Sequence, residues 1–121
     1  MARTAVPVVV LSKTGAATNA GTTADPTNDH VVDLGGHPLE EFVFRFTNTN
    51  ASDRVATIVA GVSPPALSAG QGNLDITVPA TSGDMTVAGL ESARYLQSDG
   101  TLHIDLAASY AGAVRAFRVP R

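Results

Sequence analysis

A chain of 121 residues has the length of one domain, and we expect residues 1–121 to form a single unit. The absence of cysteine excludes disulfides, thiolate metal sites and cysteine nucleophiles. The formal net charge of −3, without a run of basic residues, argues against nucleic acid as a partner. The longest apolar run is too short for a secretory signal or a bilayer span, so no membrane partner is expected.

The first third of the chain predicts two short strands separated by a long connection. Residues 6–11 are apolar and predict a strand, which Pro7 assigns to a sheet edge because proline cannot donate to a ladder. Residues 12–28 are rich in Gly, Ala, Thr, Asn and Asp and predict a long loop or extended arm. Residues 30–34 predict a short strand that ends at a pair of glycines.

The middle of the chain contains the strongest strand pattern. Residues 40–49 place Phe42, Phe44 and Phe46 at alternate positions, which puts the three rings on one face of a sheet. A turn-rich stretch follows, and residues 54–60 are predicted to pair with this strand as a hairpin. Next, consecutive prolines at 64 and 65 favour a stiff extended connection.

The last third predicts five further strands. Residues 73–78 and 102–106 alternate apolar and polar side chains without a break. Two short strands are expected at 85–88 and 93–97, separated at Gly89. Asp99-Gly100 predicts a two-residue hairpin turn, and a final strand is expected at 113–119.

Eight or nine short strands with regularly spaced turns predict an all-β, two-sheet β-sandwich. Jelly-roll and immunoglobulin-like arrangements both fit this count. Strict alternation in three segments predicts nine core side chains: Phe42, Phe44, Phe46, Leu74, Ile76, Val78, Leu102, Ile104 and Leu106.

Chemically reactive side chains are scattered and do not predict a catalytic or metal site. His30, His37 and His103 lack the short spacing that zinc or iron ligands usually show. Asp25, Asp29 and Asp33 recur every four residues, but the glycine and bidentate glutamate of a calcium loop are missing.

Paired carboxylates do not change this interpretation. Glu40 and Glu41 are neighbours on a strand, so their side chains point to opposite faces and cannot act on one bond. No nucleophile elbow or phosphate-binding loop is present in the sequence. We therefore expect no enzymatic activity, no cofactor and no metal.

Several segments resemble small virion proteins of tailed phages that infect actinobacteria. They are residues 89–100 (GLESARYLQSDG), 1–6 (MARTAV), 118–121 (RVPR), 64–67 (PPAL) and 70–74 (GQGNL). The resemblance covers most of the chain and is weakest over residues 12–37. It implies a head decoration, or cement, protein: a β-sandwich that is made in the host cytoplasm and binds the outside of the capsid lattice.

The resemblance implies the major capsid protein as partner, with neighbouring copies of the chain forming a homo-oligomer such as a trimer. A tail or head–tail connector component is an alternative on a similar sandwich. A carbohydrate-binding module on the virion surface is a second alternative, disfavoured by the lack of tryptophan. Copy number per virion would separate decoration from a connector.

Two segments are predicted to contact the partner. The first contains Arg3, Val6, Pro7 and Val9, because an edge strand readily accepts a strand from a neighbour. The alternative for residues 6–11 is that they complete the sandwich of this chain. The second segment offers a stiff apolar surface and contains Pro64, Pro65 and Leu67.

Overall fold

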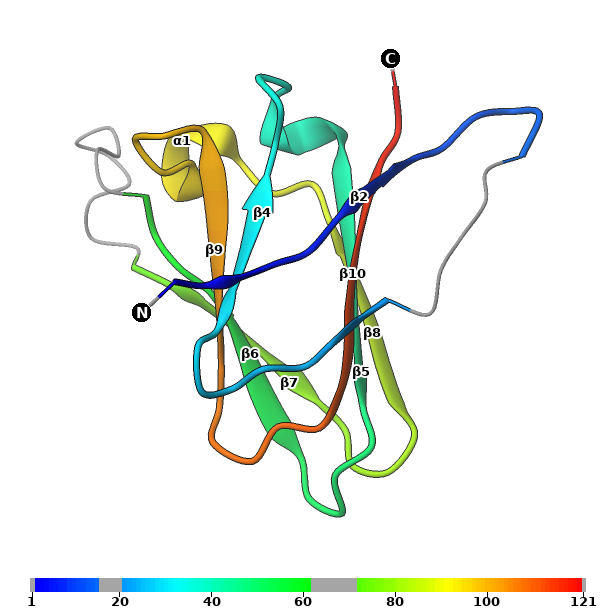
Figure 1. The fold of residues 1–121 in the computed structure, drawn as a ribbon, viewed down its shortest axis with the longest axis vertical. Coiled ribbons are helices and arrows are strands. Elements are labelled where there is room, and N and C mark those ends of the chain that lie inside the picture. Colours follow the sequence, from blue (N-terminus) through cyan, green and yellow to red (C-terminus); the bar gives the residue numbers. More distant parts are fainter. Residues whose placement is uncertain (1, 16–20, 62–71, 121) are drawn as a thin grey trace.

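Two β-sheets pack face to face in a computed structural model that describes residues 2–15, 21–61 and 72–120 (Figure 1). Sheet A has the strand order β1 (Thr4–Ala5), β4 (His30–Asp33), β9 (Thr101–Leu106), β6 (Arg54–Ile58) and β7 (Leu74–Val78). Sheet B has the order β2 (Val8–Val10), β10 (Gly112–Arg118), β5 (Phe42–Asn48) and β8 (Gly83–Ala88), and β3 (Thr22–Thr23) also pairs with β10. The sandwich predicted from the sequence is confirmed.

The strand pairing identifies the sandwich as a jelly roll. Strands β6 and β7 pair antiparallel in sheet A, and the strands that flank them, β5 and β8, pair antiparallel in sheet B. The next pair outward, β4 and β9, returns to sheet A, and β3 with β10 returns to sheet B. The chain from β3 to β10 is therefore one long antiparallel ribbon rolled so that successive pairs alternate between the sheets.

Alternation along the strands builds the core between the sheets. Eight of the nine predicted core side chains are at most 8% exposed, and Leu74 is partly buried against them. The rings of Phe42 and Phe44 stack with centroids 6.2 Å apart. Offset stacking of this kind adds to the burial of apolar area that holds the two sheets together.

The predicted hairpin between residues 40–49 and 54–60 is wrong. Strand β5 lies in sheet B and β6 in sheet A, where β6 pairs with β7 and β9. The turn after β5 is a corner between sheets. Asn48 stabilises it, because its Nδ2 donates to the carbonyl oxygen of Ser52 at 3.1 Å and its Oδ1 accepts from the N–H of Asn50 at 2.9 Å.

The predicted strand at 93–97 is also wrong. Residues Ser92–Tyr95 form a single helical turn, α1, in which the N–H of Tyr95 donates to Glu91 and that of Leu96 to Ser92. Asp99 and Gly100 lie in a turn closed by a hydrogen bond from the Gly100 N–H to the Gln97 carbonyl. The element directly before this turn is α1 and not a strand, so the turn does not join a hairpin. Strand β9 pairs with β4 and β6 instead.

The N-terminal segment, residues 3–10, belongs to both sheets. It crosses from β1 on the edge of sheet A to β2 on the edge of sheet B, with Pro7 between them (Figure 1). Both strands are parallel to their neighbours, β4 and β10. The edge position predicted from Pro7 is confirmed, whereas the single strand predicted at 6–11 is two strands. The predicted connection at 12–28 contains β3.

Two short helical turns complete the described structure. A 3-10 turn, Leu39–Glu41, leads into β5, and its Leu39 is buried in the core. Neither this turn nor α1 has the length or the apolar character required to cross a bilayer, and the described residues contain no other helix.

Candidate interaction surface

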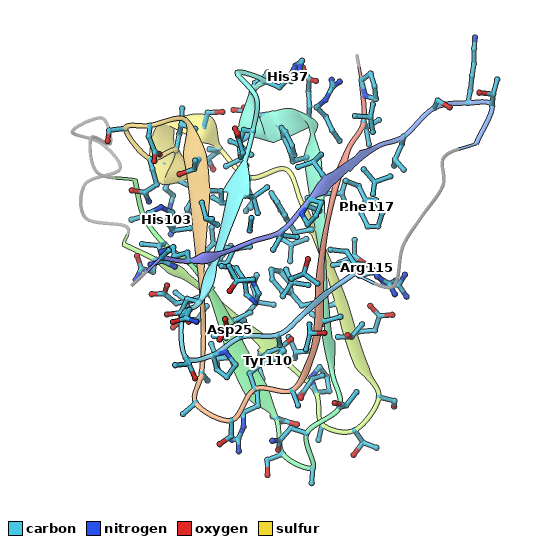
Figure 2. The ribbon with its side chains drawn as sticks, in the orientation of Figure 1. Asp25, His37, His103, Tyr110, Arg115 and Phe117 are labelled. Atoms are coloured by element: carbon cyan, nitrogen blue, oxygen red, sulfur yellow. The ribbon has the colours of Figure 1, made fainter. Side chains whose placement is uncertain are left out.

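The histidines considered from the sequence lie in separate places, and of the three only His30 has two of the considered carboxylates, those of Asp25 and Asp29, near it. Among the described residues, no group of three or more His, Cys, Asp or Glu side chains could hold a metal ion. His30 lies in the core, His37 is exposed in a loop, and His103 lies on the outer face of sheet A (Figure 2). Each of these side chains therefore has to be interpreted in its own surroundings.

The three aspartates at 25, 29 and 33 bind backbone and side-chain donors of the chain itself. Asp25 accepts from Thr4 Oγ1 at 2.6 Å and from the N–H of Asn28 at 3.1 Å. These hydrogen bonds, that of Thr4 first, lower the pKa of Asp25 below its usual value. Asp29 accepts from the N–H of Leu106, and Asp33 from that of Gly35. They stabilise turns and strand ends.

Glu40 and Glu41 bind different partners. Glu40 accepts from the hydroxyl of Ser92 at 2.7 Å, and this bond is the main cause that lowers the pKa of Glu40. Glu41 forms an ion pair with Arg118 at 3.1 Å. The two side chains diverge as the sequence predicts, but they do so from the 3-10 turn Leu39–Glu41 that precedes β5 and not from a strand.

Two residues of the first predicted contact segment are bound within this chain's own fold. The Arg3 guanidinium donates to Asp105 at 2.6 Å and to the carbonyl oxygens of His30 and Ile104, each at 3.3 Å. Val6 is 3% exposed and belongs to the core. Val6 is thereby withdrawn from a partner, whereas the Arg3 side chain stays 25% exposed in its ion pair with Asp105.

The other predicted contact residues have different positions. Pro7 is exposed at the crossing between the sheets, and Val9 is half-buried on the outer face of sheet B. Pro64, Pro65 and Leu67 lie outside the described residues. Val9 is therefore the predicted contact residue that lies on the outer face of a sheet.

The outer face of sheet B carries an apolar row that runs across all four of its main strands. In the register of the sheet, Val9 lies beside Phe117, Phe117 beside Val43, and Val43 beside Ala88. The neighbouring row points inward, since Ala116 and Phe44 are buried and Val8 and Val87 pack on the core. We call Val9, Phe117, Val43 and Ala88 the apolar row.

Phe117 and Val43 are not among the contact residues that the sequence predicts. The signal was present, because Ala116 and Phe117 are adjacent apolar residues in a strand and cannot both face the core. The same holds for Phe42 and Val43. Once the core face of each strand is known, the second member of each pair must lie on the outer face.

The apolar row has a cationic border on one side and a hollow on the other. The next row contains Arg115 and Arg45, and Nε of Arg45 donates to Asp84 at 2.8 Å. Figure 2 shows Phe117 and Arg115 on the side of β10 that faces away from sheet A. On the other side of the row, past the ends of β2 and β10, is an open hollow of about 470 Å³, lined by Leu11, Ser12, Lys13, Val119 and Pro120.

The two outer faces of the sandwich differ in charge. The strands of sheet B present two arginines and one aspartate outward, namely Arg45, Arg115 and Asp84. The strands of sheet A present three aspartates outward, Asp33, Asp75 and Asp105, of which Asp105 is paired with Arg3. Sheet B therefore offers an apolar and weakly cationic face on a chain whose net charge is −3.

Comparisons with protein-family models, with curated proteins and with solved structures found no match to this chain. The phage resemblance of its sequence segments therefore stays a prediction. The surfaces described above are the structural basis for inferring what the chain binds.

Proposed function

We propose that this chain is a structural virion protein that binds the outside of a phage capsid lattice and stabilises it. The outer face of sheet B would contact the lattice. The observation that carries this assignment is the apolar row from Val9 to Ala88, which remains on a solvent-facing side of the sheet. The resemblance of residues 89–100 to small virion proteins supports the choice of partner.

A protein of this kind stabilises a shell by mass action. It binds the assembled lattice better than the separate capsid subunits, so its binding free energy favours the intact shell. An apolar row with a charged border suits this role, because apolar burial supplies affinity and the border charges orient the approach. Valine side chains on paired strands also lose little conformational freedom on binding.

The positions of the aromatic rings argue against a carbohydrate-binding module. Sugar platforms need an accessible aromatic face, whereas Tyr95 and Tyr110 are 2% and 3% exposed. Burial also raises the pKa of Tyr110 to about 12. Phe42, Phe44 and Phe46 are buried as well, which leaves Phe117 as the one outward ring among the chain's six.

The test is co-sedimentation with shells assembled from the major capsid protein of the same phage, without this chain. We expect saturable binding with a stoichiometry that matches the lattice, and a higher melting temperature of the decorated shell. Binding confined to a single ring at one vertex would favour the connector alternative. Failure to sediment with shells at any concentration would contradict the proposal.

A further inference from the structure

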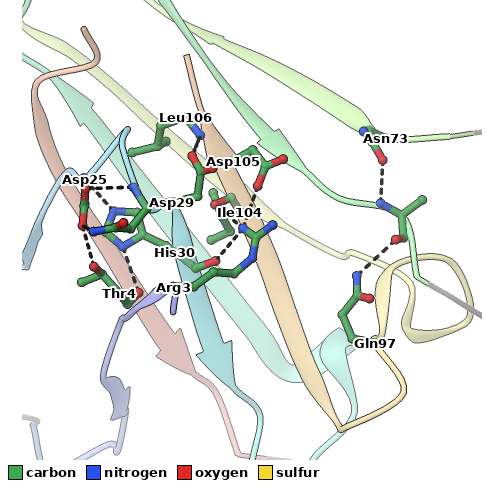
Figure 3. Close-up of polar contacts among 12 residues, drawn as sticks. Arg3, Thr4, Asp25, Asp29, His30, Asn73, Gln97, Ile104, Asp105 and Leu106 are labelled. Atoms are coloured by element: carbon green, nitrogen blue, oxygen red, sulfur yellow. Dashed lines mark hydrogen bonds and ion pairs between the residues drawn. The ribbon is translucent and has the colours of Figure 1, made fainter. Parts of the chain in front are cut away.

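A buried histidine joins the N-terminal segment to the rest of the sandwich (Figure 3). The His30 side chain is fully buried, at 0% exposed, on the inner side of β4. Its Nε2 lies 3.0 Å from the backbone nitrogen of Asp25, and its Nδ1 lies 3.1 Å from the carbonyl oxygen of Thr4. The imidazole thus bridges two segments that are far apart in the chain.

The two neighbours of the ring determine its protonation state. The Asp25 N–H can only donate, so Nε2 must be unprotonated and accept. The Thr4 carbonyl can only accept, so Nδ1 carries the proton and donates. His30 in this geometry is a neutral imidazole with both ring nitrogens in use.

Residues 3–6 are attached mainly around this ring. The Thr4 N–H donates to Asp29 and the Val6 N–H to Val31, each at 2.9 Å. The Thr4 hydroxyl donates to Asp25, the residue whose N–H binds the ring. The Arg3 guanidinium reaches Asp105 and the carbonyl of His30 itself.

We propose that His30 is an acid-sensitive latch: neutral, it holds residues 3–6 on β4, and protonation releases them. A second proton on the ring would place Nε2–H against the Asp25 N–H, so that two donors would face each other. It would also bury a positive charge among apolar core side chains, which is costly. The repulsion falls on the Asp25 side of the ring, whereas Nδ1–H still donates to the Thr4 carbonyl, so the cost of the buried charge is relieved only where water reaches the ring.

The charged groups around His30 act in opposite directions. The carboxylates of Asp25 and Asp29 favour the imidazolium, whereas the guanidinium of Arg3 disfavours it. Desolvation by burial is the largest cause and lowers the pKa of His30 below its usual value, against the raising effect of the two carboxylates and of the hydrogen bond to the Thr4 carbonyl. Acid therefore protonates His30 most readily in a state where water reaches the ring.

Opening of residues 3–6 is the least demanding route to such a state. Strand β1 is a two-residue edge strand that pairs with β4 alone. Every other pair of neighbouring strands, except the pair of β2 with β10, lies within the rolled ribbon from β3 to β10. Detachment of β1 therefore leaves these pairs intact. Local opening of an edge costs less than global unfolding, so acid should free the segment before it unfolds the sandwich.

The test is amide hydrogen exchange of Thr4 and Val6 at pH 7.5 and pH 5, corrected for intrinsic exchange rates. If the ring is fully accessible to water in the open state, the equilibrium constant for opening of residues 3–6 should be up to about 30-fold larger at pH 5 than at pH 7.5. His30→Gln is the decisive variant, because a glutamine amide can donate to Thr4 and accept from Asp25 without titrating. His103→Gln is the matched control, since this histidine lies on the outer face of sheet A.

We expect increased exchange of Thr4 and Val6 in the wild type and in His103→Gln, and no pH-dependent increase in His30→Gln. Unchanged protection of both amides in the wild type would overturn the latch. So would an equal loss of protection at Leu102 and Ile104, which would mean global unfolding. If His30→Gln does not fold, the wild-type His30 ring resonances, titrated by NMR together with the Thr4 amide, decide the same question. The latch does not depend on capsid binding, so either proposal can fail alone.

Discussion

Asn48 in sheet B donates a hydrogen bond of 3.0 Å from its side-chain amide to the backbone carbonyl of Val78 in sheet A. Asn48 is 1% exposed, so this bond joins the two sheets in a water-excluded place. The same amide also binds Ser52. One side chain therefore stabilises both the corner after β5 and the packing of β7 in sheet A against β5 in sheet B.

Asn48→Ala should lower the free energy of unfolding by about 1–3 kcal/mol, because it leaves the buried carbonyl of Val78 without this donor. Urea denaturation of the variant and the wild type measures this difference. Thr49→Ala is the matched control, since Thr49 is the next residue and is exposed. Its effect should stay within about 0.5 kcal/mol. Equal effects of both substitutions would mean that the inter-sheet bond contributes nothing specific.

Phe44→Ala should cost about 3–5 kcal/mol, because a fully buried ring is replaced by a cavity. Phe117→Ala removes the same ring from the outer face of sheet B and should cost clearly less. Chemical denaturation of both variants compares an inner with an outer phenylalanine on neighbouring strands. A larger cost for Phe117 would contradict the assignment of the two faces.

Alternation of side chains predicted the core well for a physical reason. Period two determines which residues share a face of a strand, and Phe42, Ile76 and Leu102 are accordingly buried. Alternation contains no information about which sheet a strand joins. The corner at Asn48 has the length and composition of a hairpin turn, and only its contacts with Val78 and Ser52 show that it changes sheets.

Local sequence patterns could not predict the helical turn α1, the hydrogen bonds of His30 or the positions of the contact residues. The helical turn at Ser92–Tyr95 is too short to show a helical period. The His30 bridge joins Thr4 and Asp25 through tertiary contacts that no local pattern encodes. Of the predicted contact residues, Val9 lies on the outer face of sheet B, while Val6 is in the core because the segment changes sheets at Pro7.

Acidification should destabilise the wild type through His30. Because burial lowers the pKa of His30, the unfolded chain binds a proton more readily than the folded chain. The contribution of neutral His30 is present above about pH 6.5 and is lost as the pH falls toward the lowered value. Unfolding free energies between pH 8 and pH 5 should decrease in the wild type and stay flatter in His30→Gln. Parallel curves would show that other groups cause the decrease.

Deletion of residues 2–11 should destabilise the sandwich strongly. The deletion removes the core side chain Val6, the Arg3–Asp105 ion pair and the strands that cover the edges of β4 and β10. Burial of Val6 alone is worth about 1.5–3 kcal/mol. The melting temperature of the truncated chain measures the effect. Near-wild-type melting would show that the segment is dispensable for folding and is free to act mainly as a partner contact.

Val9→Glu should abolish binding to capsid shells without unfolding the protein. Val9 is the edge member of the apolar row, so a carboxylate there would be desolvated against the lattice. Val55→Glu is the matched control, because Val55 is likewise a half-buried valine on an outer face, that of sheet A. Co-sedimentation with shells, together with the melting temperature of each variant, makes the comparison.

The two substitutions test which face of the sandwich contacts the shell, and the wild-type protein tests whether the chain binds the shell at all. Loss of binding in Val9→Glu alone, with wild-type melting, assigns the contact to the apolar row. Loss in Val55→Glu alone assigns it to sheet A, whose outward aspartates would then meet a cationic lattice surface. Wild-type binding by both variants excludes both faces and leaves the strand edges as the contact. A shell that does not bind even the wild-type protein would contradict the capsid role itself, whatever the variants do.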